Sequence, residues 1–319
     1  MMNNSLTAVN GIRVGHVTHL DGATGVTVVI CPEGTVGGVD QRGGAPGTRE
    51  TDLLRPLHSV ETVNAIVLSG GSAYGLASAD GVMHYLEEHE IGYKSGTGFL
   101  VPIVPAAILM DLPIGQVGIR PDAKMGYQAC VNATTEPVTQ GSIGAGTGCR
   151  IAAMMGNELA TKGGIGSAMI DLGDGLIISA MVAVNAVGDI IDEKGDILAG
   201  LRNPDGSGFA GALNFMKTMA RMTERPTSSN TVIGVVATNA KLSKDHTNKV
   251  AQMAQDGIAR AVNPAHTMFD GDTIFALSTG EIPANVSVIG AFAAEVMAMA
   301  IRNAVRSATS LAGVKAIND

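Results

Sequence analysis

Apolar residues occur in short continuous runs separated by Gly-, Asn- and Asp-rich segments, which predicts buried strands alternating with helices. The sharpest change falls at residue 231. Small polar residues occupy positions 227–230, and a β-branched and aliphatic run begins at Thr231 and continues to residue 239. This pattern predicts a loop leading into an interior strand whose first residue carries a hydroxyl group. An ordinary junction and a nucleophilic Thr231 are both compatible with it.

Other apolar runs predict further strands. Residues 11–30 fit two strands joined by a turn, residues 65–69 fit a short buried strand, and residues 175–189 fit a strand covered on both faces. Asn185 interrupts the last run. A buried amide needs hydrogen-bond partners, so Asn185 is either a structural bracket or a donor in a site. The glycine-rich residues 37–50 predict an irregular loop.

Helical periodicity follows several of these strands. The predicted helices cover residues 72–89, residues 212–222, a segment from Ser243 to about residue 262, and residues 286–308. Strands and helices therefore alternate, with enough helices to cover the outer faces of two stacked sheets. We predict an α/β fold, a four-layer αββα sandwich, in which residues 1–319 form a single domain.

Composition narrows the class of protein. The net charge is −8 and only 3% of the residues are aromatic, so neither a basic face nor stacking platforms for nucleic acid are expected. Three widely spaced cysteines give no disulfide framework and no paired metal ligands. No leader is visible, and the most apolar run, residues 99–110, is short and holds two prolines. We expect a soluble, cytoplasmic protein without a membrane partner.

Gly70, Gly71 and Ser72 lie between a predicted strand and a predicted helix. Free N–H groups and a helix dipole at such a junction could bind an anion or a developing oxyanion. The spacing fits neither a P-loop nor a dinucleotide fingerprint, and residues 144–148 fail the latter too. We therefore expect no nucleotide, no other cofactor and no metal.

Asp270 and Asp272 are separated by one glycine. In an extended segment both carboxylates would project from one face, and Gly271 would let another backbone come close. Such a pair can bind a metal, share a proton or hold a cation, although an Asp-Gly turn is the commoner explanation. A chain cut before Thr231 would supply the cation, because its new α-amine could serve as general base for the Thr231 hydroxyl.

Four segments carry a further signal in combination, namely residues 70–76, 184–188, 230–239 and 266–276. Together they resemble the DmpA-type and β-peptidyl aminopeptidases, a family of self-processing N-terminal-nucleophile hydrolases. The resemblance covers nearly the whole chain and is strongest to the branch of the nylon-oligomer hydrolases (NylC).

The resemblance implies an inactive precursor that cuts itself between Asn230 and Thr231, giving chains 1–230 and 231–319. Thr231 would then attack peptide, β-peptide or ω-amino-acid amide bonds through an acyl-enzyme. Asn185 would donate to the oxyanion, while Asp270 and Asp272 would position the Thr231 amine and hydroxyl. The family fold is the αββα sandwich, and the implied assembly is a homotetramer of processed α/β heterodimers.

Two positions depart from the nylon-hydrolase pattern. Met110 stands where that branch has a tyrosine before an aspartate, and Ala153 stands where it has a lysine. Lys162 is nearby but lies in a different motif, so the role of that lysine is not carried over to it. Two alternatives remain open. One is an acyltransferase of the ornithine-acetyltransferase type with the same Thr nucleophile, and the other is a non-catalytic assembly protein.

Overall fold

Two five-stranded sheets form the centre of the computed structural model, which describes residues 3–221 and 230–319. The polar positions 227–229 of the predicted loop lie outside the described residues. The first sheet has the strand order β1 (Arg13–His19), β2 (Thr24–Ile30), β5 (Ala65–Ser69), β8 (Ala106–Ile108), β4 (Thr48–Arg49). The second has the order β11 (Ile165–Asp171), β12 (Ile177–Asn185), β15 (Thr231–Lys241), β17 (Thr273–Pro283), β3 (Val36–Gln41).

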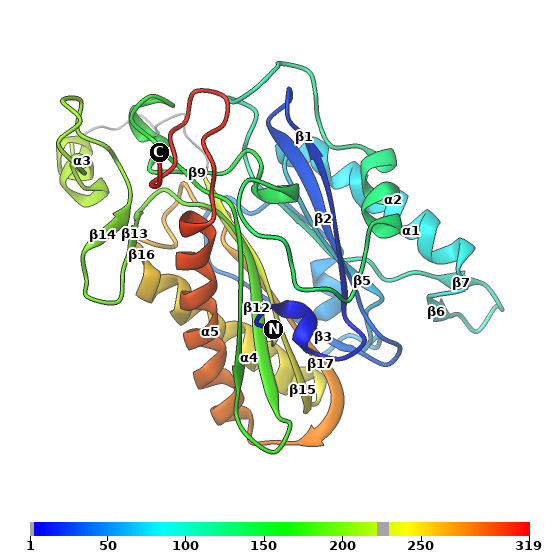
Figure 1. Cartoon of the computed structure of the whole chain (residues 1–319). Helices are drawn as coiled ribbons and strands as arrows, with labels where there is room; N and C mark the ends of the chain where they lie inside the picture. The colour runs from blue at the N-terminus through cyan, green and yellow to red at the C-terminus, as the bar shows by residue number, and fades with distance from the viewer. Residues whose placement is uncertain (1–2, 222–229) are drawn as a thin grey trace.

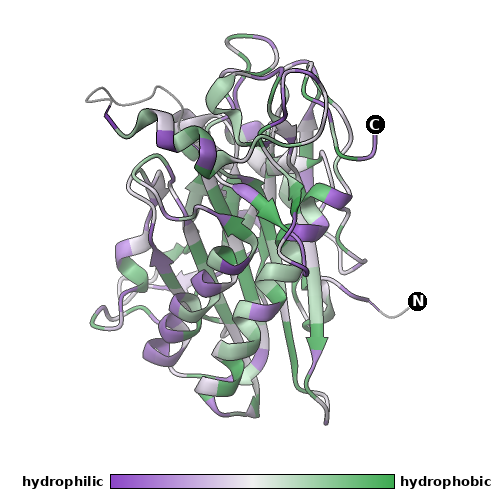
Figure 2. Ribbon diagram, turned by 90° about the vertical axis from the view of Figure 1, so that its left-hand side faces the viewer, coloured by the Kyte–Doolittle hydropathy of each residue, from purple (hydrophilic) through white to green (hydrophobic). Residues whose placement is uncertain are grey.

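Helices cover the outer face of each sheet. Two helices from the first half of the chain, α1 (Ser78–Glu88) and α2 (Ala123–Val131), pack on the first sheet. Two helices from the second half, α4 (Lys244–Ala261) and α5 (Val286–Arg306), pack on the second sheet. Figure 1 shows the four layers side by side. Figure 2 shows apolar strands inside and helices with hydrophilic outer parts. The predicted αββα sandwich is confirmed.

Strand β15 explains why the run after Thr231 is continuously apolar. Ile233 and Val235 face the first sheet, while Val232 and Val236 face the α4–α5 layer, so both faces of the strand are buried. Each such side chain contributes about 1.5–3 kcal/mol through burial. By the same alternation, Thr231 lies on the face directed toward the first sheet.

Shorter elements complete the chain. They are η1 (Leu6–Ala8), η2 (Thr51–Leu54), η3 (Ser72–Ala77), β6 (Tyr93–Lys94), β7 (Leu100–Val101), η4 (Gly144–Gly146), β9 (Arg150–Ile151), η5 (Ala153–Met155), β10 (Thr161–Lys162), β13 (Asp189–Ile191), β14 (Ile197–Ala199), α3 (Ala212–Met219) and β16 (Val262–Asn263). Helix α3 thus ends before the predicted residue 222, which lies outside the described residues.

The loop predicted for residues 37–50 is wrong in part, because this segment contains β3 and β4. Strand β3 pairs antiparallel with β17 at the edge of the second sheet. Its glycines hide the strand pattern, and they are there because α4 packs directly on the backbone. A Cβ at Gly38 would lie 2.6 Å from the main-chain nitrogen of Asn248.

Within the described residues, α5 is the one helix long and apolar enough to cross a membrane. Two thirds of its most apolar window, 67%, is buried inside the protein. It packs along β11 and β12, where a Cβ at Gly166 would collide with its backbone. In this structure α5 is therefore a core helix of the second sheet.

Candidate active site

Thr231 begins β15, between β12 and β17 in the middle of the second sheet. It lies opposite Asn185, the last residue of β12. Thr231 is 4% exposed and Asn230 is 1% exposed, so both sides of the bond that joins them are buried. The predicted loop-to-strand junction is therefore an enclosed site rather than a surface connection.

The backbone of Asn230 is held on both sides by the segment that carries the two aspartates. Its N–H donates to the carbonyl of Phe269 at 2.9 Å, and its carbonyl accepts from the N–H of Gly271 at 3.0 Å. These two bonds form a one-residue parallel bridge opposite Asp270. The Thr231 hydroxyl donates to the same Asn230 carbonyl oxygen. The hydroxyl oxygen of Thr231 and the adjacent carbonyl are thus in contact.

The carboxylate of Asp272 links the strand start to His266. One oxygen accepts from the N–H of Val232 at 2.8 Å, and the other accepts from His266 through its main-chain N–H at 3.1 Å and its Nδ1 at 2.8 Å. Burial opposes the charged ring, but the hydrogen bond and charge of Asp272 outweigh it and raise the pKa of His266 above its ordinary value. The partly exposed His266 and the buried Asp272 therefore form a pair at the start of β15.

Asp270 has a different set of partners. One carboxylate oxygen accepts from the N–H of Thr267 at 3.0 Å and from its hydroxyl at 2.6 Å, and the other accepts from the N–H of Val187 at 3.4 Å. Burial, followed by the charge of Asp272, raises the pKa of Asp270 to about 6. The charge of Asp272 thus adds to the effect of burial on Asp270, and the catalytic role of the pair stays a prediction.

Gly271 allows two close approaches. A Cβ at this position would lie 2.6 Å from the carbonyl oxygen of Ala45 and 3.0 Å from the Thr231 hydroxyl oxygen. Ala45 in turn donates its N–H to the carbonyl of Asp270 at 2.8 Å, and Arg42 donates to the carbonyl of Asp272 at 3.0 Å. The expectation that another backbone approaches Gly271 is confirmed, and that backbone is residues 42–45 of the same chain.

Asn185 is fully buried, and two main-chain groups fix its orientation. Its Oδ1 accepts from the N–H of Arg150 at 2.9 Å, and its Nδ2 donates to the carbonyl of Met110 at 3.1 Å. The structural-bracket interpretation is therefore observed. An amide nitrogen carries two hydrogens, so one remains for an oxyanion, and that donor role stays a prediction. Because the contact uses a carbonyl, the Met110 side chain is not needed for it.

The expectation of free N–H groups at residues 70–72 is wrong. Gly70 donates to the carbonyl of Gly25 at 3.0 Å, and Ser72 donates to the carbonyl of Leu109 at 3.0 Å. Gly71 donates to the carboxylate of Asp111 at 2.6 Å. Neighbouring segments thus accept all three bonds, two through the carbonyls of Gly25 and Leu109 and one through the carboxylate of Asp111. A role of this segment in substrate binding stays a prediction.

Ala153 and Lys162, the two positions considered above for the lysine of the nylon hydrolases, both make packing or main-chain contacts. Ala153 packs in a small apolar cluster with Ala23 and Ala160. Lys162 is fully buried, and its Nζ donates to the carbonyls of Gly146 at 3.1 Å and Gly163 at 2.8 Å. Burial lowers the pKa of Lys162 to about 8. These bonds tie the glycine-rich turn to β10.

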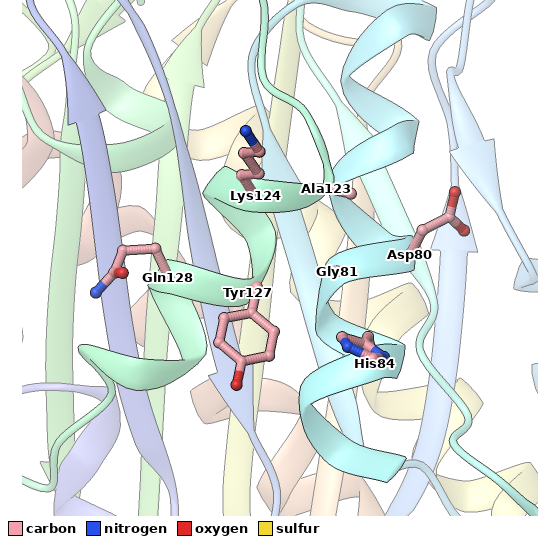
Figure 3. A pocket seen from close by; sticks show the side chains of 7 residues that line it. All are labelled: Asp80, Gly81, His84, Ala123, Lys124, Tyr127 and Gln128. Atoms are coloured by element: carbon pink, nitrogen blue, oxygen red, sulfur yellow. The ribbon is translucent and has the colours of Figure 1, made fainter. Parts of the chain in front are cut away.

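Two further features lie elsewhere. Across residues 3–221 and 230–319, no group of three or more His, Cys, Asp and Glu side chains could hold a metal ion. A surface hollow of about 460 Å³ lies between α1 and α2. Figure 3 shows His84 and Tyr127 meeting there from the two helices, with ring centroids 5.9 Å apart. The hollow is on the outer helix layer and is lined from α1 and α2, so it is separate from the junction.

Sequence reasoning missed three residues that position the others. His266 and Thr267 hold Asp272 and Asp270, and their polarity just before the two aspartates was a signal that could have identified them. Arg150 acts on Asn185 through its main-chain N–H. No side-chain pattern could have indicated that contact.

Two sheets packed between helix layers have the layering of the N-terminal-nucleophile hydrolases. Solved structures agree with that fold. A Burkholderia β-aminopeptidase superposes with a TM-score of 0.73 at 23% identity, covering 99% of this chain and 91% of the other. The L-aminopeptidase D-Ala-esterase/amidase of Ochrobactrum anthropi, described as a variant of the Ntn hydrolase fold, gives 0.72 at 20% identity, covering 96% and 86%.

The sequence comparisons are more specific. The model of peptidase family S58 matches residues 4–318, and the chain belongs to this family. An uncharacterised aminopeptidase of Mycobacterium leprae is 44% identical, covering 98% of this chain and 92% of that protein. A 6-aminohexanoate-oligomer endohydrolase of Kocuria is 31% identical, covering 93% and 84%. The resemblance expected from the motifs is confirmed, and the chain is a hydrolase acting on amide bonds.

Proposed function

We propose that the chain is a precursor that cuts itself between Asn230 and Thr231 and then works as an aminopeptidase or amidase with Thr231 as its N-terminal nucleophile. The observation that carries this proposal is the buried contact between the Thr231 hydroxyl and the Asn230 carbonyl. The N–H of Gly271 donates to that carbonyl, and the N–H of Asn230 donates to the carbonyl of Phe269, so the residue is held from both sides. A hydroxyl fixed on the preceding carbonyl is prepared for intramolecular attack.

In the self-cleavage step, Thr231 Oγ forms a bond to the carbonyl carbon of Asn230, and the carbonyl electrons move onto its oxygen. Collapse of this intermediate breaks the peptide bond, and the hydroxyl proton ends on the Thr231 nitrogen. Water then hydrolyses the ester. The products are a chain ending in the Asn230 carboxylate and a chain beginning with a free amine and hydroxyl on Thr231.

In the mature enzyme, the new Thr231 amine takes the hydroxyl proton as Thr231 attacks the substrate amide. In this proposal Asp270 and Asp272 orient this amine and stabilise its protonated form. The second amide hydrogen of Asn185 donates to the oxyanion, a contribution typically worth about 3 kcal/mol. Water releases the acyl group from Thr231 and restores the free hydroxyl.

The names of the relatives and the charge at the site support a substrate class for this proposal. Relatives carry the names aminopeptidase and 6-aminohexanoate-oligomer endohydrolase. Peptides, β-peptides and ω-amino-acid amides share an amide bond with an amine on the acyl side. The Asp270 and Asp272 carboxylates next to Thr231 suit such a cationic amine. A substrate panel comparing these three amides with their N-acetylated forms tests this preference, which equal rates would contradict.

The test of the nucleophile is the mass of the purified chain under denaturing conditions. We expect fragments of residues 1–230 and 231–319, the smaller starting at Thr231. Thr231→Val keeps the shape of the side chain, removes the hydroxyl and should abolish both cleavage and turnover. Thr238→Val is the matched control, because it removes a buried hydroxyl from the same strand, one that donates to Ile177 at 2.7 Å. A wild-type chain that stays intact and has the same mass pattern as Thr231→Val would contradict the proposal.

We also propose the homotetramer of processed heterodimers that the family resemblance implies. Its native mass would be that of four copies of the 32.5 kDa chain. Light scattering on the processed protein tests this, and a monomeric or dimeric mass would contradict it. The acyl-transfer alternative is tested separately, by measuring acetyl transfer from acetylornithine to glutamate. We expect no acetyl transfer above the background of this assay.

A further inference from the structure

We infer that the main-chain N–H of Gly271 is the oxyanion donor of the self-cleavage step, distinct from Asn185, the donor proposed for substrate turnover. The inference rests on the proposed self-cleavage at Thr231. It concerns which group stabilises the negative charge when the Asn230 carbonyl becomes tetrahedral.

The geometry begins with the carbonyl oxygen of Asn230. The N–H of Gly271 donates to this oxygen at 3.0 Å, which is already a hydrogen-bond distance in the precursor. The Thr231 hydroxyl contacts the same carbonyl group, so attack would place the developing charge on an oxygen that already has a donor. A donor fixed before the reaction needs no reorganisation as the charge forms.

Hydrogen bonds of the neighbouring residues also fix the position of Gly271. The Phe269 carbonyl accepts the Asn230 N–H at 2.9 Å, so the two chain segments meet as a one-residue ladder. On the other side, Ala45 donates to the Asp270 carbonyl at 2.8 Å and Arg42 donates to the Asp272 carbonyl at 3.0 Å. These bonds hold the peptide unit between residues 270 and 271 with its N–H directed at Asn230.

The residue type at position 271 fits this role. A Cβ there would lie 3.0 Å from the Thr231 hydroxyl oxygen and 2.6 Å from the Ala45 carbonyl oxygen. Glycine therefore lets the N–H, the nucleophile and the supporting loop converge on one carbonyl. Among the described residues, the Asn185 amide bonds to Arg150 and Met110, whereas the Asn230 carbonyl accepts from Gly271. The precursor and the mature enzyme would thus use different oxyanion donors with the same nucleophile.

The direct test replaces one N–H by an oxygen atom. Cell-free translation of the full chain with glycolic acid in place of Gly271 gives an ester that lacks only this donor. We expect self-cleavage to slow by roughly 100-fold or more, as for loss of other oxyanion donors. Such an ester also weakens the Asp270 carbonyl as an acceptor for Ala45. The matched control is therefore lactic acid in place of Ala45, which removes that bond entirely and leaves the Gly271 N–H in place.

Each outcome decides one point. Slow cleavage with the ester at position 271 and near-normal cleavage with the ester at position 45 supports the assignment. Equal rates for the position-271 ester and the wild type overturn it, as does equal slowing by the two esters. Failure of the proposed function looks different, because the unmodified cell-free chain would then stay whole, as Thr231→Val does.

Discussion

His266 is linked to the start of strand β15 through the carboxylate of Asp272. Its ring and main-chain N–H both bond to one oxygen of Asp272, whose other oxygen holds the N–H of Val232. His266 also has a left-handed backbone, with φ of 57°. The residue therefore acts on Thr231 through Asp272 and is a positioning residue rather than a catalytic one.

The stability of the precursor should depend on pH through His266. The folded pKa of His266 is raised, so its ion pair with Asp272 is fully present below the unfolded value of 6.5 and is lost as pH rises through the folded pKa. In the uncut Thr231→Val background, the free energy of unfolding should fall as pH rises above 6.5. His266→Asn keeps a donor and tolerates a positive φ but does not titrate, so it should reduce this slope. Urea unfolding at several pH values checks this, and an unchanged slope would count against the pair.

At the scale of an element, β3 shows how close packing replaces side-chain pattern. Gly38→Ala would place a Cβ 2.6 Å from the main-chain nitrogen of Asn248 at the start of α4. Because backbone cannot move aside cheaply, we expect a loss of about 1–3 kcal/mol or more in the free energy of unfolding. Gly96→Ala is the matched control. Its Cβ would meet nothing within 4 Å, so a change within about 0.5 kcal/mol is expected. Equal effects in denaturant melts would contradict this account of β3.

The elements that could be predicted are those whose burial is evident from the hydrophobicity of their own side chains. Strands β12 and β15 are covered on both faces, so their apolar runs were visible in the sequence. Asp270 and Asp272 were visible because they are neighbours in sequence as well as in space. The Arg150 N–H and the Met110 carbonyl that hold Asn185 could not be identified from the sequence, because main-chain groups carry no side-chain signal. Strand β3 was missed because the fit against α4 requires glycine there.

For the whole molecule, the proposed cut falls between parts that cannot easily separate. Chain 231–319 would carry β15, β17, α4 and α5. Strand β15 pairs with β12 on one side, and β17 pairs with β3 on the other, so two strands of the large chain enclose two strands of the small one. Both chains also contribute to the core between the sheets. Cleavage would therefore leave one folded body.

We expect the two processed chains to co-elute under native conditions and to unfold in a single thermal transition. Denaturing electrophoresis of the same sample should resolve them. The uncut Thr231→Val chain is the control for the elution volume and for the shape of the transition. Separate elution of a 231–319 fragment, or two separate transitions, would contradict the interlocked sheet described above.

The buried aspartates beside the junction would also give the proposed self-cleavage a direction. An uncut peptide bond is neutral, whereas cleavage and hydrolysis create an ammonium on Thr231 and a carboxylate on Asn230 at the same place. Asp270, whose pKa burial and Asp272 already raise to about 6, would attract the first and repel the second. One new end would be retained as the working group, and the other would be driven out of the space that a substrate must enter. The aspartates would thus hold the Thr231 ammonium in the site and drive the Asn230 carboxylate out of it.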